Sequence, residues 1–196
     1  MNDELMTAKQ ELRRQMRKLR KAHALSLDES TRALIFMRPP GAVLASIPRD
    51  AIIGLYLDLP EEAPARPYAR FFHESGHRIA LPWFAGRDSL MEFREWRDPF
   101  GESDLEHGAW GAQPDSANDR LVPEVLFCPL VAFTEGGERM GQGGGHYDRW
   151  LEAHPASRTI GMAWDQQKVE SLPLEPHDRP LSMIVTPTRL YGPFDA

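Results

Sequence analysis

Apolar residues follow two patterns along most of the chain: short apolar runs typical of buried strands, and the spacing typical of one face of a helix. Short apolar runs predict strands at 51–57, 78–82, 90–96, 125–133, 158–164 and 182–186. Helix-type spacing predicts helices at 7–23, 27–37 and 67–76, a helix that starts near Tyr147 and a short helical turn at 165–171. Strands that alternate with helices indicate an α/β fold with a largely parallel sheet between helix layers.

The first two predicted helices carry start and stop signals. Thr7 and Gln10 form a capping-box pair for the first helix. Ser26, with Glu29 three residues on, does the same for the second. The second helix is expected to stop at the Pro-Pro-Gly sequence of residues 39–41.

The first helix combines an apolar stripe with a strongly basic composition. The stripe consists of Ala8, Leu12, Met16 and Leu19. At about 100° per residue, Lys9, Arg13 and Arg20 flank this stripe, whereas the other cations are expected on the solvated face. Cations that border a buried stripe can reach a neighbouring cleft while their aliphatic stems pack. A helix that binds nucleic acid would also be basic, but this one lacks interleaved aromatic residues.

A glycine-rich loop lies between the predicted strand 125–133 and the helix that starts near Tyr147. Its six glycines occupy positions 136, 137, 141, 143, 144 and 145. Glycine lets backbone N–H groups approach a phosphate closely, and a helix N-terminus adds partial positive charge. Arg139 can bring a full positive charge, and Asp148 is well placed to hold magnesium beside bound phosphates. The loop therefore predicts a nucleotide site.

Two familiar phosphate loops do not fit this sequence. A Walker A loop ends in Gly-Lys-Ser/Thr, but Gln142 follows Gly141 here. His146 occupies the slot of the third glycine of a dinucleotide fingerprint. A long glycine-rich turn without a ligand is the alternative interpretation.

Length, charge and cysteine content set the broad class. The chain has 196 residues, which suits one domain, and 41% hydrophobic with 27% charged residues is typical of a globular protein. A net charge of −6 argues against nucleic acid as a partner. Cys128 is the only cysteine, and no apolar run reaches the ~18 residues of a membrane span. We therefore expect a cytoplasmic protein with no membrane partner.

Three further features each leave two interpretations open. Glu61 and Glu62 follow the strand 51–57, where open α/β sheets place ligands, but loop carboxylates ordinarily face solvent. Trp110, in a polar stretch at 99–122 that we expect to be loop, either caps the core or stacks on a ligand ring. A histidine pair at 73 and 77 has metal-ligand spacing without a third ligand and is interpreted as surface.

The motif that runs from Pro129 through Phe133, Arg139 and the glycines to Tyr147-Asp148 resembles the signature of the 5-formyltetrahydrofolate cyclo-ligase family. These enzymes are also called 5,10-methenyltetrahydrofolate synthetases. The resemblance extends from Lys9 to about Thr186. It implies a single domain over 1–196 with the basic helix packed on it, in a three-layer α/β/α fold with a mostly parallel sheet. That fold is similar to the phosphosugar-isomerase and CoA-transferase group.

The resemblance also implies an activity, its cofactors and its partners. The reaction is ATP-dependent cyclisation of 5-formyltetrahydrofolate to 5,10-methenyltetrahydrofolate, with release of ADP and phosphate after phosphorylation of the formyl oxygen. ATP and Mg²⁺ are the implied cofactors. The expected partners are the folate substrate and ATP, and the expected assembly is a monomer or a weak dimer.

Specific residues are implied by the same resemblance. Arg139 and Lys9 are the implied catalytic residues. The implied ATP-binding residues are Lys9, Arg13, Arg139, Met140, Gly141, Gln142, Gly143, Gly144, Gly145, His146 and Tyr147. The implied folate-binding residues are Arg13, Leu57, Glu62, Trp110, Gly143, Gly144, Gly145 and His146. The implied metal ligands are Asp148 and Asp178. Glu62 fits the family position better than Glu61, since it lies five residues beyond Leu57.

His146 departs from the family pattern, in which a tyrosine usually precedes Tyr-Asp. The departure keeps open a non-catalytic relative that binds folate or nucleotide without turnover. A phosphosugar isomerase of related fold is a third possibility, which would need a catalytic base but no ATP.

Overall fold

The computed structural model describes residues 2–175 and 179–194. Its helices are α1 (Asn2–Ser26), α2 (Glu29–Leu34), α3 (Gly41–Ser46), α4 (Arg66–Glu74) and α5 (His146–Ala153), with one 3₁₀ turn, η1 (Asp165–Gln167). Its strands are β1 (Ile53–Gly54), β2 (Ile79–Trp83), β3 (Glu92–Glu95), β4 (Leu105–Gly108), β5 (Gly111–Pro114), β6 (Arg120–Leu121), β7 (Val125–Pro129), β8 (Ala132–Phe133), β9 (Arg139–Met140), β10 (Arg158–Met162), β11 (Met183–Val185) and β12 (Leu190–Tyr191).

An eight-stranded sheet forms the centre, in the order β12-β11-β10-β7-β1-β2-β3-β6. The strands from β11 to β2 pair in parallel, whereas β12, β3 and β6 pair antiparallel at the two edges. The predicted α/β fold with a mostly parallel sheet is confirmed. From β1 the next parallel strand, β2, is added on one side of the sheet, whereas from β7 the following strands, β10 and β11, are added on the other side. The topological switch point, where the strand order reverses, therefore lies between β1 and β7, and open α/β sheets bind ligands at such points.

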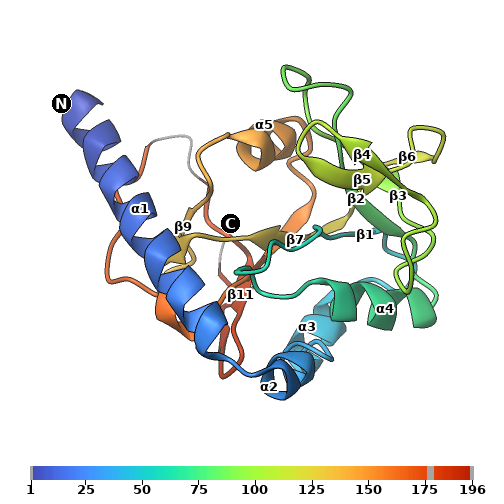
Figure 1. Ribbon diagram of the computed structural model, residues 1–196, viewed down its shortest axis with the longest axis horizontal. Helices are drawn as coiled ribbons and strands as arrows, with labels where there is room; N and C mark the ends of the chain where they lie inside the picture. The colour runs from blue at the N-terminus through green and yellow to red at the C-terminus, as the bar shows by residue number, and fades with distance from the viewer. Residues whose placement is uncertain (1, 176–178, 195–196) are drawn as a thin grey trace.

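Helices cover both faces of this sheet, which gives three layers (Figure 1). Alternate residues of β7 point to opposite faces, as in any strand. Val125 and Phe127 pack with α3 and α4, whereas Leu126 and Cys128 pack with Trp150 of α5. α4 connects β1 to β2, so these parallel neighbours form one strand–helix–strand unit.

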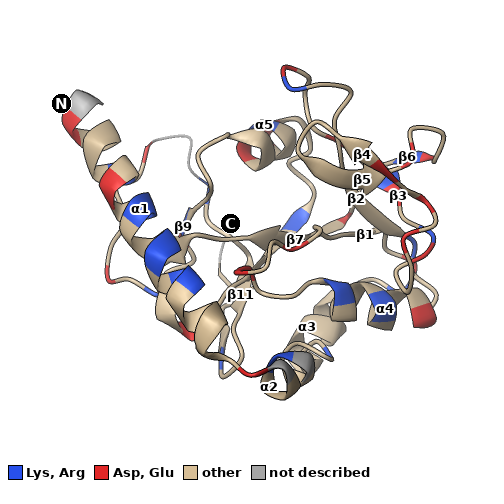
Figure 2. Cartoon of the chain, viewed as in Figure 1, with Lys and Arg blue, Asp and Glu red and all other residues tan. Residues whose placement is uncertain are grey.

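α1 runs beside β9 at one end of the molecule and carries a row of basic residues (Figures 1 and 2). The predicted start at Thr7 is wrong, because the helix begins at Asn2. The predicted apolar stripe is also wrong in part: Leu19 is 46% exposed, whereas Lys9 and Arg20 are buried. The buried face contains cations because it packs on carboxylates and backbone carbonyls.

Other element boundaries differ from the sequence predictions. α2 begins at Glu29 with Asp28 as its N-cap, whose carboxylate accepts a bond from the Thr31 N–H at 2.8 Å. Ser26, the predicted cap, is the last residue of α1. The run 125–133 divides into β7 and β8, and the expected loop 99–122 contains β4, β5 and β6. Within residues 2–175 and 179–194, no helix is both long enough and apolar enough to cross a bilayer.

Candidate active site

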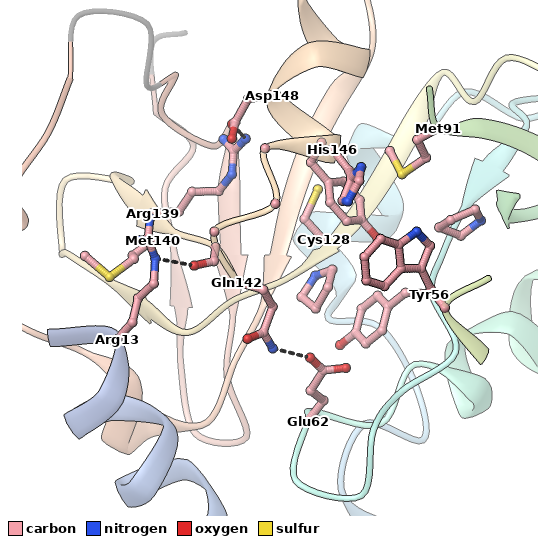
Figure 3. Close-up of a pocket in the computed structure, with 18 of the residues that line it drawn as sticks. Arg13, Tyr56, Glu62, Met91, Cys128, Arg139, Met140, Gln142, His146 and Asp148 are labelled. Carbon is pink, nitrogen blue, oxygen red and sulfur yellow. Dashed lines mark hydrogen bonds and ion pairs between the residues drawn. The ribbon is translucent and has the colours of Figure 1, made fainter. Parts of the chain in front are cut away.

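A cavity of about 620 Å³ opens at the carboxyl ends of β1, β2 and β7. Tyr56, Pro82 and Pro129 line it at these three strand ends. The glycine loop 141–145 and the start of α5 form one wall, and α1 contributes another (Figure 3). The cavity thus lies at the switch point of the sheet, where α/β folds bind ligands.

The glycine loop is held against α1 by two arginines. Arg13 Nε donates to the Gly141 carbonyl at 3.1 Å, and Arg17 Nη2 donates to the Gln142 carbonyl at 2.6 Å. Gly143 has φ +104°, which strongly favours glycine, and the Arg13 guanidinium lies beside it. Gly145 is the N-cap of α5 and supplies no side chain to the first helical N–H groups. Backbone N–H groups at the start of α5 and the guanidinium groups of α1 therefore lie close together, and such a combination favours binding of an anion.

Two further cations lie on the same side of the cavity, and each contacts a carboxylate. Lys9 Nζ lies 2.6 Å from Glu175 Oε2. Arg139 is on β9, not in an open loop as expected, and its side chain is buried. Its Nη1 donates to the Arg179 carbonyl at 2.7 Å, and its Nη2 lies 2.5 Å from Asp148 Oδ1. A phosphate chain bound here would compete with these carboxylates for the cations.

Glu62 is a buried carboxylate on the opposite wall, only 5% exposed. Its Oε2 accepts the Leu59 N–H at 3.0 Å, and its Oε1 accepts Nε2 of Gln142 at 3.0 Å (Figure 3). Burial raises the pKa of Glu62, although the Leu59 N–H and nearby Arg20 act in the opposite direction. Through Gln142, the glycine loop and the Glu62 loop are in direct contact.

Glu61 differs from its neighbour. It does not line the cavity, which agrees with the choice of Glu62 as the inward-facing carboxylate. The expectation that Glu61 is a purely solvated charge is wrong, because its Oε1 lies 3.4 Å from Nη2 of Arg20. Its backbone carbonyl also accepts Nε1 of Trp164 at 2.9 Å.

Three neighbouring rings line the cavity, those of Phe84, Trp110 and His146. Trp110 is 58% exposed, and its ring centroid lies 5.6 Å from His146 and 6.3 Å from Phe84. His146 and Phe84 are 5.0 Å apart, edge to face. Burial, and then the charge of Arg149, lower the pKa of His146, so the imidazole is neutral at neutral pH. These rings offer a surface for a flat ligand.

Cys128 lies in the cavity wall and is not an activated nucleophile. Burial raises the pKa of its thiol to about 12. The thiolate needed for nucleophilic attack is therefore scarce at neutral pH.

Asp148 is the described residue best placed for a magnesium ion. Its carboxylate is 40% exposed in the first turn of α5 and lines the cavity. Among the described residues, no group of three His, Cys, Asp or Glu side chains could hold a metal. Mg²⁺ commonly uses one or two carboxylates plus substrate phosphates, so a single carboxylate fits a metal that binds with a nucleotide. Asp178, the second predicted ligand, lies outside the described residues.

The cavity brings together all the other residues predicted as site residues. They are Lys9, Arg13, Leu57, Glu62, Trp110, Arg139, Met140, Gly141, Gln142, Gly143, Gly144, Gly145, His146, Tyr147 and Asp148. Their contact with ligands stays a prediction. The histidine pair at 73 and 77 lies elsewhere, and His77 Nδ1 bonds the Ala51 carbonyl at 2.8 Å.

Several lining residues were not predicted from the sequence. Tyr56 and Phe84 follow strands, so the rule that ligands bind at strand carboxyl ends would have found them. Glu175 and Arg179 come from the segment after η1 and carry no pattern that marks them.

Comparison with known proteins supports one family. Residues 5–187 match the model of the 5-formyltetrahydrofolate cyclo-ligase family. A stretch of 70 residues is 49% identical to the 5-formyltetrahydrofolate cyclo-ligase of Escherichia coli (strain K12), covering 35% of this chain and 38% of that protein. A stretch of 67 residues is 34% identical to the Mycolicibacterium smegmatis cyclo-ligase, covering 34% of each chain. These matches therefore span well under half the length of the curated relatives.

Solved structures support the fold along almost the whole chain. The 5,10-methenyltetrahydrofolate synthetase of Aquifex aeolicus is similar with a TM-score of 0.75 and 24% identity, covering 96% of this chain and 94% of that one. The Mycoplasma pneumoniae synthetase gives a TM-score of 0.64 at 21% identity, covering 90% and 96%.

Proposed function

The chain belongs to the 5-formyltetrahydrofolate cyclo-ligase family, and on that premise we propose that it closes 5-formyltetrahydrofolate to 5,10-methenyltetrahydrofolate with ATP. One observation carries the proposal beyond the family match. A single cavity of about 620 Å³ joins a glycine loop suited to phosphates with a buried carboxylate suited to a pterin. The two halves are within reach of each other, since Gln142 of the loop bonds Glu62 at 3.0 Å.

We assign the glycine-loop end to the triphosphate of ATP. The loop N–H groups and the open start of α5 would bind phosphate oxygens. Arg13 and Arg139 would add charge-assisted bonds, and Lys9 would reach the same phosphates from α1. These cations already contact carboxylates or carbonyls, so their side chains are held in place before the nucleotide binds.

We assign the Glu62 end to the folate. The pterin ring carries N–H donors and an amino group, and an ionised Glu62 offers acceptors for them. The rings of Phe84, Trp110 and His146 would then flank the flat part of the substrate.

The proposed reaction has two steps. The formyl oxygen attacks the γ-phosphorus of ATP, the new O–P bond forms, and the bond to the bridging oxygen breaks to release ADP. N10 then attacks the formyl carbon, the N10–C bond forms, and the C–O bond breaks to release phosphate. The N10 proton passes to solvent. Neither step needs a protein nucleophile, in agreement with the inert thiol of Cys128.

Charge neutralisation and positioning are the protein's contributions. Arg139 and Lys9 would balance charge on the γ-phosphoryl group as it moves. Asp148 would hold Mg²⁺, which when bound would supply positive charge to the phosphate chain. Arg139 contacts Asp148, which supports a shared role of the two side chains at one end of the phosphate chain.

A turnover assay tests this function. The purified protein is mixed with 5-formyltetrahydrofolate and Mg-ATP, and the absorbance of the methenyl product is followed together with ADP and phosphate. We expect product only when ATP is present, with one ADP and one phosphate for each product. A non-hydrolysable ATP analogue serves as the control and should give no product.

This assay, with ligand-binding titrations and a separate incubation with phosphosugars, separates the alternatives. Binding of both ligands without product would support a non-catalytic relative, for which the histidine at position 146 is the sequence feature. Isomerisation of a phosphosugar without ATP would indicate the third possibility. Either result contradicts the proposed cyclo-ligase activity.

A further inference from the structure

Arg20 is a buried cation that has no role in the reaction proposed above. It lies on α1 and is 1% exposed. Arginine is almost never fully buried unless it is paired. Its contacts therefore indicate what it does.

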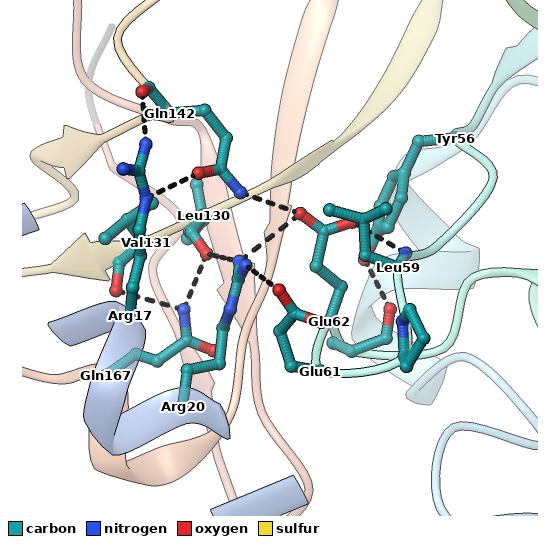
Figure 4. A network of polar contacts seen from close by, with 12 residues as sticks. Arg17, Arg20, Tyr56, Leu59, Glu61, Glu62, Leu130, Val131, Gln142 and Gln167 are labelled. Atoms are coloured by element: carbon teal, nitrogen blue, oxygen red, sulfur yellow. Dashed lines mark hydrogen bonds and ion pairs between the residues drawn. The ribbon is translucent and has the colours of Figure 1, made fainter. Parts of the chain in front are cut away.

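The Arg20 guanidinium lies between a backbone carbonyl and two carboxylates (Figure 4). Its Nη1 donates to the Leu130 carbonyl at 3.1 Å and to Glu62 Oε1 at 3.3 Å. Its Nη2 reaches Glu61 Oε1 at 3.4 Å. The Leu130 carbonyl also accepts Nε2 of Gln167 at 2.6 Å, which fixes this oxygen. Arg20 is thus anchored at the sheet and directed toward the Glu62 loop.

These contacts do not form a strong structural ion pair. The two carboxylate distances, 3.3 and 3.4 Å, are longer than those of a good charge-assisted bond. The buried Nε of Arg20 has no hydrogen-bond partner among the residues that the structure describes. An unsatisfied buried donor lowers stability, and buried ion pairs are weak evidence for stability. A role in keeping Glu62 ready for a ligand accounts better for such an arrangement.

We propose that Arg20 is a positioning residue that holds the Glu62 carboxylate at the cavity as the acceptor for the N–H donors of the pterin. This inference rests on the proposed function, because it needs a folate at the Glu62 end. Arg20 itself does not line the cavity, so it would act through Glu62.

Arg20 is the cation that acts on the pKa of Glu62, together with several neutral groups. Burial raises the pKa of Glu62 most, and the charge of Asp58 raises it further, whereas the Leu59 N–H and then Arg20 lower it. Tyr56 and Tyr147 also face this carboxylate, and burial keeps the pKa of each phenol well above its usual range, so both stay neutral. Gln142 adds a neutral hydrogen bond. Loss of Arg20 would therefore raise the pKa of Glu62 again.

The higher pKa of Glu62 without Arg20 sets the direction in which the pH dependence of folate binding should shift. An ionised acceptor is present above the pKa of the carboxyl group and is lost as pH falls through it. Without Arg20, folate binding should be lost at a higher pH than in the wild type. At neutral pH the affinity should fall at least about tenfold, because a protonated Glu62 loses its charge-assisted hydrogen bonds to the pterin.

The experiment titrates 5-formyltetrahydrofolate without ATP, by tryptophan fluorescence, from mildly acidic to mildly alkaline pH. Arg20→Met should move the loss of binding to higher pH, and Arg20→Lys should restore most of the wild-type profile. Arg14→Met is the matched control on the same helix, since Arg14 is exposed and pairs only with Glu11 among the contacts described. It should leave the profile unchanged.

A double variant covers the case in which Arg20→Met fails to fold. Arg20→Met/Glu62→Gln removes both charges and leaves no unpaired buried carboxylate at position 62. If Arg20 acts through Glu62, this variant binds folate as weakly as Glu62→Gln alone, without its own pH dependence. A further drop in affinity below Glu62→Gln would overturn the proposal.

The failure of the inference and that of the proposed function give different results. If the wild type does not bind 5-formyltetrahydrofolate, the proposed function fails. If it binds and Glu62→Gln weakens binding, but the profile of Arg20→Met equals that of the wild type, only the role of Arg20 is overturned.

Discussion

Arg139 and Asp148 form an ion pair beside the glycine loop, with Nη2 of the arginine 2.5 Å from Oδ1 of the aspartate. The arginine side chain is buried, whereas the carboxylate is partly exposed to the cavity. In the proposed reaction one of them contacts phosphate and the other contacts magnesium. The pair therefore keeps two groups of opposite charge in place before the ligands bind, and binding of Mg-ATP would separate them.

Asp148→Asn should raise the magnesium requirement of turnover at least about tenfold, because a hard cation needs the carboxylate charge. The melting temperature without nucleotide should change little, because the amide oxygen of asparagine can still accept the hydrogen bond from Arg139. The measurement is the initial rate against magnesium concentration. Glu152→Gln, on an exposed position of α5, is the control. An unchanged magnesium dependence would contradict the assignment of Asp148 as a metal ligand and would indicate that its role is structural.

Arg139→Ala should lower kcat by about 100- to 1000-fold, the usual effect of removing one donor that stabilises charge in a transition state. Because this side chain is buried and bonded, the stability should fall as well. Circular dichroism at the assay temperature checks that the variant is folded. Arg14→Ala, an exposed arginine, is the control. A folded Arg139→Ala protein within threefold of wild-type activity contradicts the assignment.

Glu62→Gln should weaken folate binding at least tenfold, since charge-assisted hydrogen bonds are worth ~1.5–3 kcal/mol each, and should leave ATP affinity nearly unchanged. Glu61→Gln should have a much smaller effect, because Glu61 is outside the cavity and its carboxylate reaches Arg20 at the long distance of 3.4 Å. Fluorescence titration with each ligand separately gives both affinities. Equal effects of the two variants would mean that Glu62 has no special role.

Asp58→Asn should stabilise the protein without ligand at neutral pH. Burial raises the pKa of Asp58 above its unfolded value, so the charged form destabilises the fold. Asparagine can keep the bond that Oδ1 accepts from the Ala65 N–H at 3.2 Å. The gain should be full above the folded pKa and should disappear as pH falls to about 4, the ordinary carboxyl value. Urea unfolding at several pH values measures it, and a gain that is the same at all pH values would contradict the argument.

The sequence predicted the elements whose burial follows a simple period. β7, β10 and α5 came from apolar runs and from spaced aromatic residues, and β7 and α5 contribute residues to the cavity. The hairpin β4–β5 was missed because few of its residues are buried or apolar, so its pairing depends on contacts with the rest of the fold.

The face of α1 shows a different limit. A hydrophobic pattern assigns buried positions to apolar residues, but Lys9 and Arg20 are buried and Leu19 is exposed. Their partners, Glu175 and Glu62, are far away in the sequence, and no local pattern joins them. The glycine loop could be predicted because its motif is local, whereas the role of Arg20 required the tertiary structure.

The ion pair between Lys9 and Glu175 joins residues 166 positions apart. During synthesis α1 therefore leaves the ribosome long before the segment that carries Glu175. Contacts between such distant segments form slowly, because a long loop must close before they are gained. β1, β2 and β7 precede Glu175 and can pair earlier, so the proposed nucleotide end of the cavity would be completed only after these strands, and a nascent chain would not bind ATP before Glu175 has been made.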